Sequence, residues 1–239
     1  MSKVRLFFPK DKISDIVVIN DKETLHKTND VLVLKKGERV YLFDGEGTEY
    51  RYQISEANRK YISLKKEAVE RTVSSPKEKI TLAIPLLKEP KLELILQKAT
   101  EFGIWSFQLF TCERSIHGQP SSGKKERWKK IIDEATRQSD RLWTAQINEI
   151  VDFETLTKQD FSLKIAASIT GQKITGIIKE KCPKTLLVIG PEGDFSPNEY
   201  EKFKISGFKF LKLSENILRV ETAAIVASGL INYFLTQEI

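Results

Sequence analysis

Two short stretches near the C-terminus constrain the fold of this chain more than any other feature. They are Gly190-Pro191-Glu192-Gly193 and Ile217-Leu218-Arg219-Val220-Glu221-Thr222-Ala223. Each follows a compact apolar run typical of a buried strand, and each leads directly into a helical pattern. Strand ends that deliver small residues and backbone amides to the start of a helix form the ligand crevices of α/β folds. The sequence therefore predicts one ligand site built from both stretches.

The chain changes character near residue 75. Before this point, short segments are rich in β-branched and aromatic residues, which predicts a small β-barrel or sandwich; they are residues 6–8, 16–19, 39–43, 49–54 and 61–64. We expect Asp44-Gly45-Glu46-Gly47 to form a hairpin turn and residues 71–79 to be a linker. Beyond it, continuous apolar strands alternate with helices, which predicts a mostly parallel sheet with helices on both faces. The predicted domains are residues 1–73 and 74–239.

Several helix ends in the second domain are marked by capping residues. Gly103 is placed to end a helix whose apolar face begins at Leu92. Ser196, followed by proline and then by Glu199, predicts a capping box at a helix start. Thr222 is predicted to cap the last helix. The expected strands lie at residues 80–84, 107–112, 163–167, 185–189 and 208–213, and a long helix is expected at residues 124–140.

Composition narrows the class of protein. The 39 Lys and Arg residues outnumber the 33 Asp and Glu residues by six, which is compatible with a polyanionic partner but does not require one. Two cysteines and two histidines make a zinc site unexpected and indicate a reducing compartment. No apolar stretch approaches the roughly 20 residues of a membrane span. We expect a soluble, cytoplasmic protein with no bound metal.

A basic stripe marks the segment of residues 124–141. Arg127, Lys130, Arg137 and Arg141 fall on one side of the expected helix, opposite its apolar stripe. Such a stripe is either a solvated surface or a contact with a phosphate backbone, and the sequence leaves both open. The preceding loop, from Gly118 to Lys125, resembles a phosphate-binding loop, but lysine takes the place of the Ser or Thr that would bind Mg²⁺.

Taken together, the motifs resemble the RsmE-type branch of the SPOUT RNA methyltransferases, over nearly the whole chain. The two C-terminal motifs carry most of the resemblance. Residues 91–103, 112–115 and 134–141 look like further blocks of that family, and residues 26–37, which include His26, resemble part of its RNA-binding barrel. The chain departs from the family pattern at four of the positions used below. Asp140 and Asp194 stand where glycine is usual, and Ser214 and Asn216 stand where Gly and Arg are typical.

The resemblance implies a PUA-like β-barrel followed by a knotted α/β domain, working as a homodimer in the cytoplasm. It implies methyl transfer from S-adenosylmethionine to N3 of a uridine in 16S rRNA, free or in the small ribosomal subunit. The residues that it places around the cofactor are Gly190, Glu192, Gly193, Leu213, Ile217, Leu218, Arg219, Glu221, Thr222 and Ala223. The residues that we expect to contact RNA are His26, Arg127 and Lys130.

The chemistry of this reaction points to an arginine. Uridine N3 carries a proton and is a poor nucleophile, so charge that develops on the neighbouring carbonyl oxygens must be stabilised. Arginine stays charged and presents several donors. Arg114, at a strand end, is our first candidate, and Arg137, Arg141 and Arg219 are alternatives. Two other functions remain open on the sequence alone: a P-loop-like nucleotide hydrolase using residues 118–125, and a non-catalytic RNA-binding ribosome factor.

Overall fold

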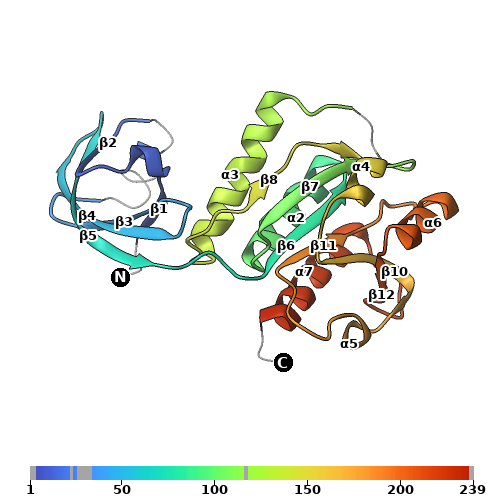
Figure 1. Ribbon diagram of the computed structural model, residues 1–239. Coiled ribbons are helices and arrows are strands. Elements are labelled where there is room, and N and C mark those ends of the chain that lie inside the picture. The colour runs from blue at the N-terminus through green and yellow to red at the C-terminus, as the bar shows by residue number, and fades with distance from the viewer. Residues whose placement is uncertain (1–3, 22–23, 26–33, 116–117, 237–239) are drawn as a thin grey trace. The chain divides into compact units, whose positions relative to one another are not determined.

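The structure, a computed structural model, describes residues 4–21, 24–25, 34–115 and 118–236 of the 239-residue chain (Figure 1). The chain divides into two compact units. The first contains Met1–Ser75 and Arg137–Thr144, and the second contains Pro76–Thr136 and Ala145–Ile239. The last two residues of the long helix, 137 and 138, and the segment that follows them therefore belong to the first unit, while the rest of that helix belongs to the second.

The first unit is built on a five-stranded sheet with the order β1-β3-β4-β5-β2. Its strands are β1 (Arg5–Phe7), β2 (Ile16–Ile19), β3 (Arg39–Phe43), β4 (Thr48–Ala57) and β5 (Ile62–Thr72), and a 3-10 helix η1 spans Lys10–Lys12. β1 pairs with β3 in parallel, and the remaining pairs are antiparallel. Tyr52 and Ile54 of β4 and Ile62 and Leu64 of β5 are buried at every second position, as expected for strands with one face on a core.

The expected hairpin turn joins β3 to β4. Asp44 Oδ1 accepts hydrogen bonds from the backbone N–H groups of Glu46 and Thr48 at 2.8 and 2.9 Å. Gly45 and Gly47 take φ angles of 76° and 102°, which glycine adopts without the steric cost that a side chain adds. β5 continues to Thr72, so the linker is shorter than expected and Arg71 belongs to the strand.

The second unit is built on a parallel sheet with the order β12-β10-β11-β6-β7-β8, and β9 also pairs with β7. Its strands are β6 (Lys79–Pro85), β7 (Ser106–Thr111), β8 (Gln146–Ile147), β9 (Val151–Asp152), β10 (Leu163–Gln172), β11 (Lys184–Val188) and β12 (Lys209–Leu211). β10 is inserted between β11 and β12. The strands that lead into the two C-terminal motifs are therefore not direct neighbours.

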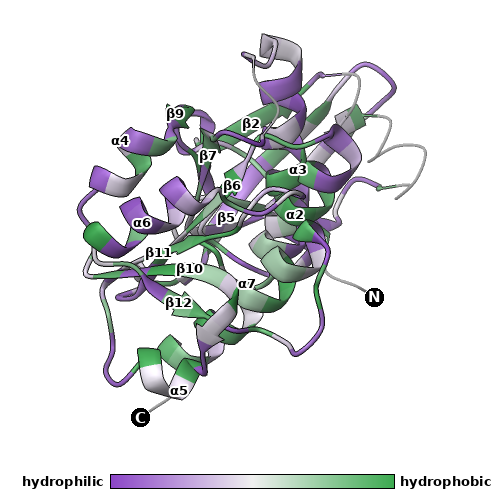
Figure 2. Ribbon diagram, turned by 90° about the vertical axis from the view of Figure 1, so that its right-hand side faces the viewer, coloured by the Kyte–Doolittle hydropathy of each residue, from purple (hydrophilic) through white to green (hydrophobic). Residues whose placement is uncertain are grey.

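Helices cover both faces of this sheet, as predicted. They are α2 (Glu89–Glu101), α3 (Ser122–Gln138), α4 (Phe153–Lys158), α5 (Ile174–Ile177), α6 (Pro197–Ile205) and α7 (Val220–Thr236). Figure 2 shows α4 and α6 along one face of the sheet and α2 and α7 along the other. The strands match this division: Leu187 faces the cluster of α2, α3 and α7, while Leu186 and Val188 face the cluster of α4 and α6. Because both faces of β11 are covered by helices, its side chains on both faces are apolar, which explains the continuous apolar run in the sequence.

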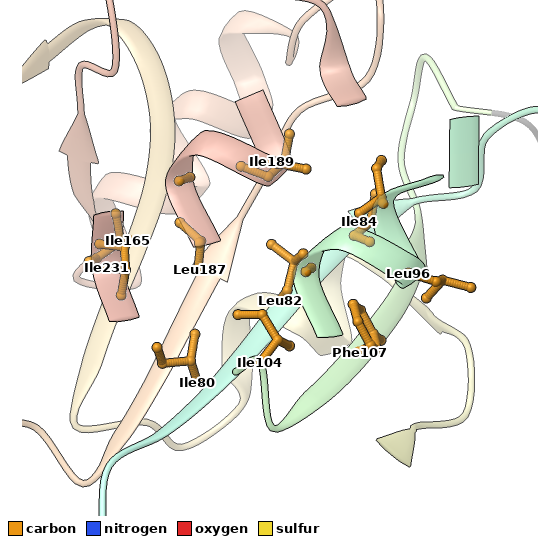
Figure 3. Packing of buried hydrophobic residues seen from close by; sticks show 14 of the residues in the cluster. Ile80, Leu82, Ile84, Leu96, Ile104, Phe107, Ile165, Leu187, Ile189 and Ile231 are labelled. Atoms are coloured by element: carbon orange, nitrogen blue, oxygen red, sulfur yellow. The ribbon is translucent and has the colours of Figure 1, made fainter. Parts of the chain in front are cut away.

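The larger core cluster fills the space between the sheet and α2 and α7 (Figure 3). Leu82, Ile84, Leu96, Ile165 and Ile231 are each fully buried in it. The end of α2 is set by Gly103, as expected. Gly103 N–H donates to Thr100 O at 3.0 Å and Ile104 N–H donates to Ala99 O at 3.1 Å, the paired bonds of a glycine-terminated helix.

The predictions for the starts of two helices, α6 and α7, had different outcomes. The Ser196 capping box on α6 is confirmed, because the Ser196 side chain accepts from Glu199 N–H and the Glu199 carboxylate accepts from Ser196 N–H. The prediction that Thr222 caps the last helix was wrong. α7 begins at Val220, and Ala223 N–H donates to Arg219 O at 2.8 Å, so helical hydrogen bonding already includes Thr222. Within the described ranges, no helix combines the length and the apolar character needed to cross a bilayer.

Candidate functional site

A pocket of about 350 Å³ opens at the carboxyl ends of three neighbouring strands, β12, β10 and β11. Its walls are formed by part of β10 and by the segments that follow β11 and β12: Ala167, Ser168, Ile169, Ile189, Gly190, Pro191, Glu192, Gly193, Asp194, Leu213, Ser214, Asn216, Ile217, Leu218, Val220 and Ala223. Because parallel strands end at the same edge, segments far apart in sequence meet there. The position corresponds to the usual ligand crevice of α/β sheets.

Seven of the ten residues predicted to bind cofactor line this pocket: Gly190, Glu192, Gly193, Leu213, Ile217, Leu218 and Ala223. Arg219, Glu221 and Thr222 do not line it. Arg219 immediately precedes α7, and Glu221 and Thr222 lie in its first turn. The wall formed by residues 167–169 of β10 was not expected from the sequence, because nothing in the chain order indicates that β10 inserts between β11 and β12.

Lys91 links the two C-terminal motifs at the mouth of the site. Its Nζ lies 2.5 Å from Glu192 Oε1 and 4.0 Å from Glu221 Oε2. The hydrogen bond with Glu192 raises the pKa of Lys91, and the same bond lowers the pKa of Glu192. Lys91 thus lies between Glu192 of the first motif and Glu221 of the second. The sequence block at residues 91–103 contained this lysine, but its periodicity showed only an apolar helix face.

The loop after β11 combines close packing with an unusual backbone conformation. A Cβ atom at Gly190 would lie 3.1 Å from Phe195 Cε2, and one at Gly193 would lie 3.3 Å from Arg114 Cδ. Asp194, which lines the pocket, has a φ of 58°. A non-glycine residue in the left-handed region is uncommon, and aspartate is among the residues that tolerate it best.

Arg114, our first catalytic candidate, lies against this loop. It follows β7, is exposed, and its Nη1 donates to Gly193 O at 2.6 Å. The guanidinium thus lies beside the pocket while further N–H groups are left for another ligand. A side chain added at Gly193 would therefore contact the side chain of Arg114.

Arg137 and Arg141 belong to the first unit. Arg5 donates to Arg137 O at 2.8 Å and to Arg141 O at 3.0 Å, and its Nε lies 2.6 Å from Glu49. Arg5 and Glu49 are both buried. Burial also lowers the pKa of Arg141 to about 10. The segment that carries both arginines is therefore held within the first unit by hydrogen bonds from Arg5, whose guanidinium is itself paired with the buried Glu49.

The basic stripe does not extend as far as predicted. α3 ends at Gln138, and Asp140 has a φ of 59°, so Arg141 lies beyond the helix and is partly buried. The expectation that Arg141 lies on the same side of this helix as Arg127 and Lys130 was wrong, because the left-handed conformation of Asp140 turns the chain away after the helix ends. Arg127 is exposed and makes a two-point ion pair with Glu93 at 2.6 and 2.8 Å, and Lys130 is exposed. Both stay candidates for RNA contact; His26 lies outside the described residues.

The loop resembling a phosphate-binding loop has a different organisation. β7 ends at Thr111, well before Gly118, and Lys124 pairs with Glu89 of α2 at 3.0 Å. Cβ atoms added at Gly118 or Gly123 would meet no atom within 4 Å, so neither glycine marks a close approach. Across the described part of the chain, no three His, Cys, Asp or Glu side chains are grouped so as to hold a metal ion.

Comparison with known proteins decides the family. The family described as "RNA methyltransferase domain" matches residues 74–232, and "RNA methyltransferase PUA domain" matches residues 30–67. The chain belongs to this RNA methyltransferase family. The resemblance seen in the sequence is thereby confirmed, and so is the order of a PUA-like domain followed by a mostly parallel α/β domain.

Individual relatives support the family assignment along the whole chain. "Ribosomal RNA small subunit methyltransferase E" of Synechocystis is 30% identical over 97% of this chain and 78% of the relative. The protein of the same name from Bacillus subtilis is 30% identical over 88% of each chain. The small subunit methyltransferase E of Neisseria gonorrhoeae, solved bound to S-adenosyl methionine, superposes with a TM-score of 0.86 at 23% identity, over 97% of this chain and 98% of that one. The last comparison shows the shared fold. The knot implied by the resemblance stays a prediction.

Proposed function

We propose that this protein transfers a methyl group from S-adenosylmethionine to N3 of a uridine in 16S rRNA. The observation that carries the proposal is the pocket at the ends of β10, β11 and β12, to which both C-terminal motifs contribute in a member of an RNA methyltransferase family. Relatives named for small-subunit rRNA methylation support the substrate class. The Neisseria structure with bound S-adenosyl methionine supports the cofactor.

The pocket has the chemistry that this cofactor needs. Its volume of about 350 Å³ is within the range for a small-molecule site, roughly 300–1,000 Å³. Ile189, Leu213 and Leu218 offer apolar surface for a base or sugar, and Gly190 and Gly193 expose backbone groups to polar atoms. When bound, S-adenosylmethionine supplies an electrophilic methyl group. The pocket residues would hold it, and Lys91 would keep the two motifs together through Glu192 and Glu221.

Arg114 is the residue best placed to act on the uridine. Removal of the N3 proton makes the uracil ring anionic, and the negative charge is shared with the neighbouring carbonyl oxygens. A fixed guanidinium next to the pocket can donate to such an oxygen and hold the ring in line for transfer. The hydrogen bond to Gly193 O orients Arg114, so the loop that lines the pocket also positions the candidate catalytic group.

The RNA must present an unpaired or flipped uridine, because N3 is engaged in a base pair. The formal charge of +6 and the PUA-like domain support RNA as the partner. Arg127 and Lys130 on the exposed side of α3 are the residues that we assign to phosphate contacts, with His26 in the barrel. Because Arg127 is already paired with Glu93, phosphate binding there would have to compete with that ion pair.

The protein is also proposed to be a cytoplasmic homodimer. The cytoplasm follows from the proposed rRNA substrate. The dimer is supported by an apolar face on α7, defined by Val226, Gly229 and Tyr233, which lie at i, i+3 and i+7. Val226 and Tyr233 are 43% and 60% exposed, and Phe102, which is 44% exposed, extends this face by packing on Gly229. Exposed apolar patches of this kind are typical of protein interfaces.

The proposal is tested by incubating the full-length protein with labelled S-adenosylmethionine and small ribosomal subunits that lack the modification. Label recovered as 3-methyluridine at one position of 16S rRNA is the expected result. Binding of subunits without methyl transfer would instead support the non-catalytic ribosome factor. Stabilisation by ATP and Mg²⁺, but not by S-adenosylmethionine or S-adenosylhomocysteine, would support the nucleotide hydrolase.

A further inference from the structure

Asp194 places a carboxylate in the wall of the pocket. Two hydrogen bonds fix this side chain. Its Oδ1 accepts from Phe195 N–H at 2.8 Å and from Tyr200 Oη at 2.9 Å, and its Oδ2 lies 3.1 Å from the same phenol oxygen. The backbone is held as well, because Asp194 N–H donates to Pro191 O at 3.0 Å. The carboxylate is therefore a fixed feature of the pocket.

Tyr200 holds the carboxylate without neutralising it. The pKa of Tyr200 is raised to about 12, mainly by burial and in addition by the neighbouring Asp194 carboxylate. The phenol therefore remains a neutral donor at physiological pH. It also lies 3.4 Å from Ser168 Oγ of β10, and Ser168 lines the same pocket. The phenol thus connects the β10 wall to the carboxylate.

Two other carboxylates near the pocket are paired with lysines. Glu192 pairs with Lys91 at 2.5 Å and Glu215 pairs with Lys212 at 2.6 Å. Arg114 directs Nη1 to the Gly193 carbonyl rather than to Asp194. Among the residues that the structure describes, Asp194 has hydrogen bonds but makes no ion pair with a Lys, Arg or His side chain. Its negative charge is left to act on whatever occupies the pocket.

Building on the proposed function, we propose that Asp194 makes the pocket prefer the cationic, sulfonium-bearing cofactor to its product. During methyl transfer the bond between methyl carbon and sulfur breaks, and its electron pair stays on the sulfur. The ligand therefore loses one positive charge, while the rest of the molecule is unchanged. A fixed carboxylate stabilises the charged ligand more than the neutral-sulfur product. The residue thus disfavours retention of product after each turnover, a property that glycine at this position would lack.

Calorimetric titration of three ligands into the full-length protein tests this charge preference. The ligands are S-adenosylmethionine, S-adenosylhomocysteine and an analogue with a protonated amine in place of the methylsulfonium. Asp194→Asn tolerates the left-handed conformation and keeps an oxygen acceptor for Phe195 and Tyr200. We expect it to weaken binding of both cationic ligands about tenfold, equivalent to about 1.4 kcal/mol. Binding of S-adenosylhomocysteine should change less than about twofold.

Two further variants separate charge from folding. Asp194→Gly accepts the positive φ, removes the carboxylate, and should show the same selective loss. Glu215→Gln removes a carboxylate on the neighbouring loop that does not line the pocket, and should leave all three affinities unchanged. Equal losses for cationic and neutral ligands, or no loss for either, would overturn the role of Asp194. If the wild-type protein binds none of the three, the proposed function fails first, and this inference fails with it.

Discussion

Two aspartates adopt the same rare backbone conformation. Asp140 and Asp194 have φ angles of 59° and 58°, in the left-handed region that glycine adopts most readily. Each has taken on stabilising contacts that glycine could not make. Asp194 accepts from Tyr200, and Asp140 accepts from Arg71 at 2.6 and 2.9 Å. In both cases the left-handed turn is kept, and its steric cost is offset by hydrogen bonds to a carboxylate.

The residue that we expect to matter most for catalysis is Arg114. Arg114→Ala should reduce the rate of methyl transfer by about 10²–10³, the loss typical of one preorganised donor. RNA affinity should be largely retained, because the interaction strengthens as the uracil becomes anionic. Arg114→Lys should recover part of the rate, since lysine restores the charge without the planar fork. Single-turnover methylation with both substrates saturating measures the effect.

Lys202→Ala is the matched control, because Lys202 is another exposed cation of the second unit and pairs with Glu154 on the face covered by α4 and α6. Its rate should equal that of the wild type. An Arg114→Ala rate within about threefold of the wild type would transfer the role to Arg137, Arg141 or Arg219.

At the scale of elements, the crossing of β10 and β12 is the tightest backbone contact near the pocket. Ala167 and Gln172 of β10 both pair with Leu211 of β12, so the residues between them bulge out. Gly171 lies in this bulge. A Cβ atom there would come within 2.6 Å of Leu211 C and Lys212 N, and these are backbone atoms that cannot rotate away. Glycine is therefore required by close approach and not by a positive φ.

Gly171→Ala should separate β10 from β12 and lower the free energy of unfolding by about 1–3 kcal/mol, the range for overpacking. Gly123→Ala is the matched control, because a Cβ atom there meets nothing within 4 Å and Gly123 lies in α3. That substitution should raise stability by up to about 1 kcal/mol. Urea denaturation of both variants measures the difference. Equal stabilities would show that the two strands can move apart without cost.

The long helix α3 carries a second element-scale feature, a partly buried acid. One carboxylate oxygen of Asp133 is buried and has no hydrogen-bond partner among the described residues. Burial raises the pKa of Asp133 from 3.8 to about 6. The folded state therefore binds this proton more tightly than the unfolded state. The stability that the group contributes is complete below about pH 4 and is lost as the pH rises through about 6.

Asp133→Asn should accordingly raise the free energy of unfolding at pH 7 by about 1–3 kcal/mol, since each pKa unit corresponds to about 1.4 kcal/mol. At pH 4 the variant and the wild type should be nearly equal. Asp152→Asn should instead lower the free energy of unfolding at pH 7, because hydrogen bonds from Thr155 lower the pKa of Asp152 and so stabilise its ionised form. Thermal unfolding between pH 4 and pH 7 measures both variants. A benefit of Asp133→Asn that is the same at both pH values would exclude titration as its cause.

At the scale of the whole molecule, the apolar face of α7 and Phe102 leads to a prediction about assembly. Val226→Asp combined with Tyr233→Asp would place two charges in the proposed dimer interface, where they would be desolvated without partners. We expect this double variant to be monomeric in sedimentation velocity and the wild type to be dimeric. Ile205→Asp is the control, because Ile205 is 85% exposed at the end of α6, on the opposite face of the sheet. A monomeric wild type would contradict the prediction.

Much of this organisation was visible in the sequence, because it depends on local periodicity and local caps. The strand β11 was recognisable from its continuous apolar run, and α6 from the Ser196 capping box, since each signal lies within a few residues of the element it specifies. The two C-terminal motifs were expected at one site, and six of the nine residues chosen from them line one pocket. Family membership followed from the same motifs.

Other features depend on contacts between residues far apart in the chain, and only the tertiary structure decided them. Insertion of β10 between β11 and β12 brings Ser168 and Ile169 into the pocket wall, although chain order suggests that β11 and β12 are neighbours. Lys91 and Glu192 are separated by 101 positions in the sequence, and no local pattern predicts their ion pair. The left-handed turn at Asp140 ends α3 early, and Arg5 and Arg71 hold residues 137–144 to the first unit. Sequence periodicity indicates which face of a helix or strand is apolar. Ion pairs and backbone contacts between residues far apart in the sequence produce no periodic pattern, so they could not be predicted from it.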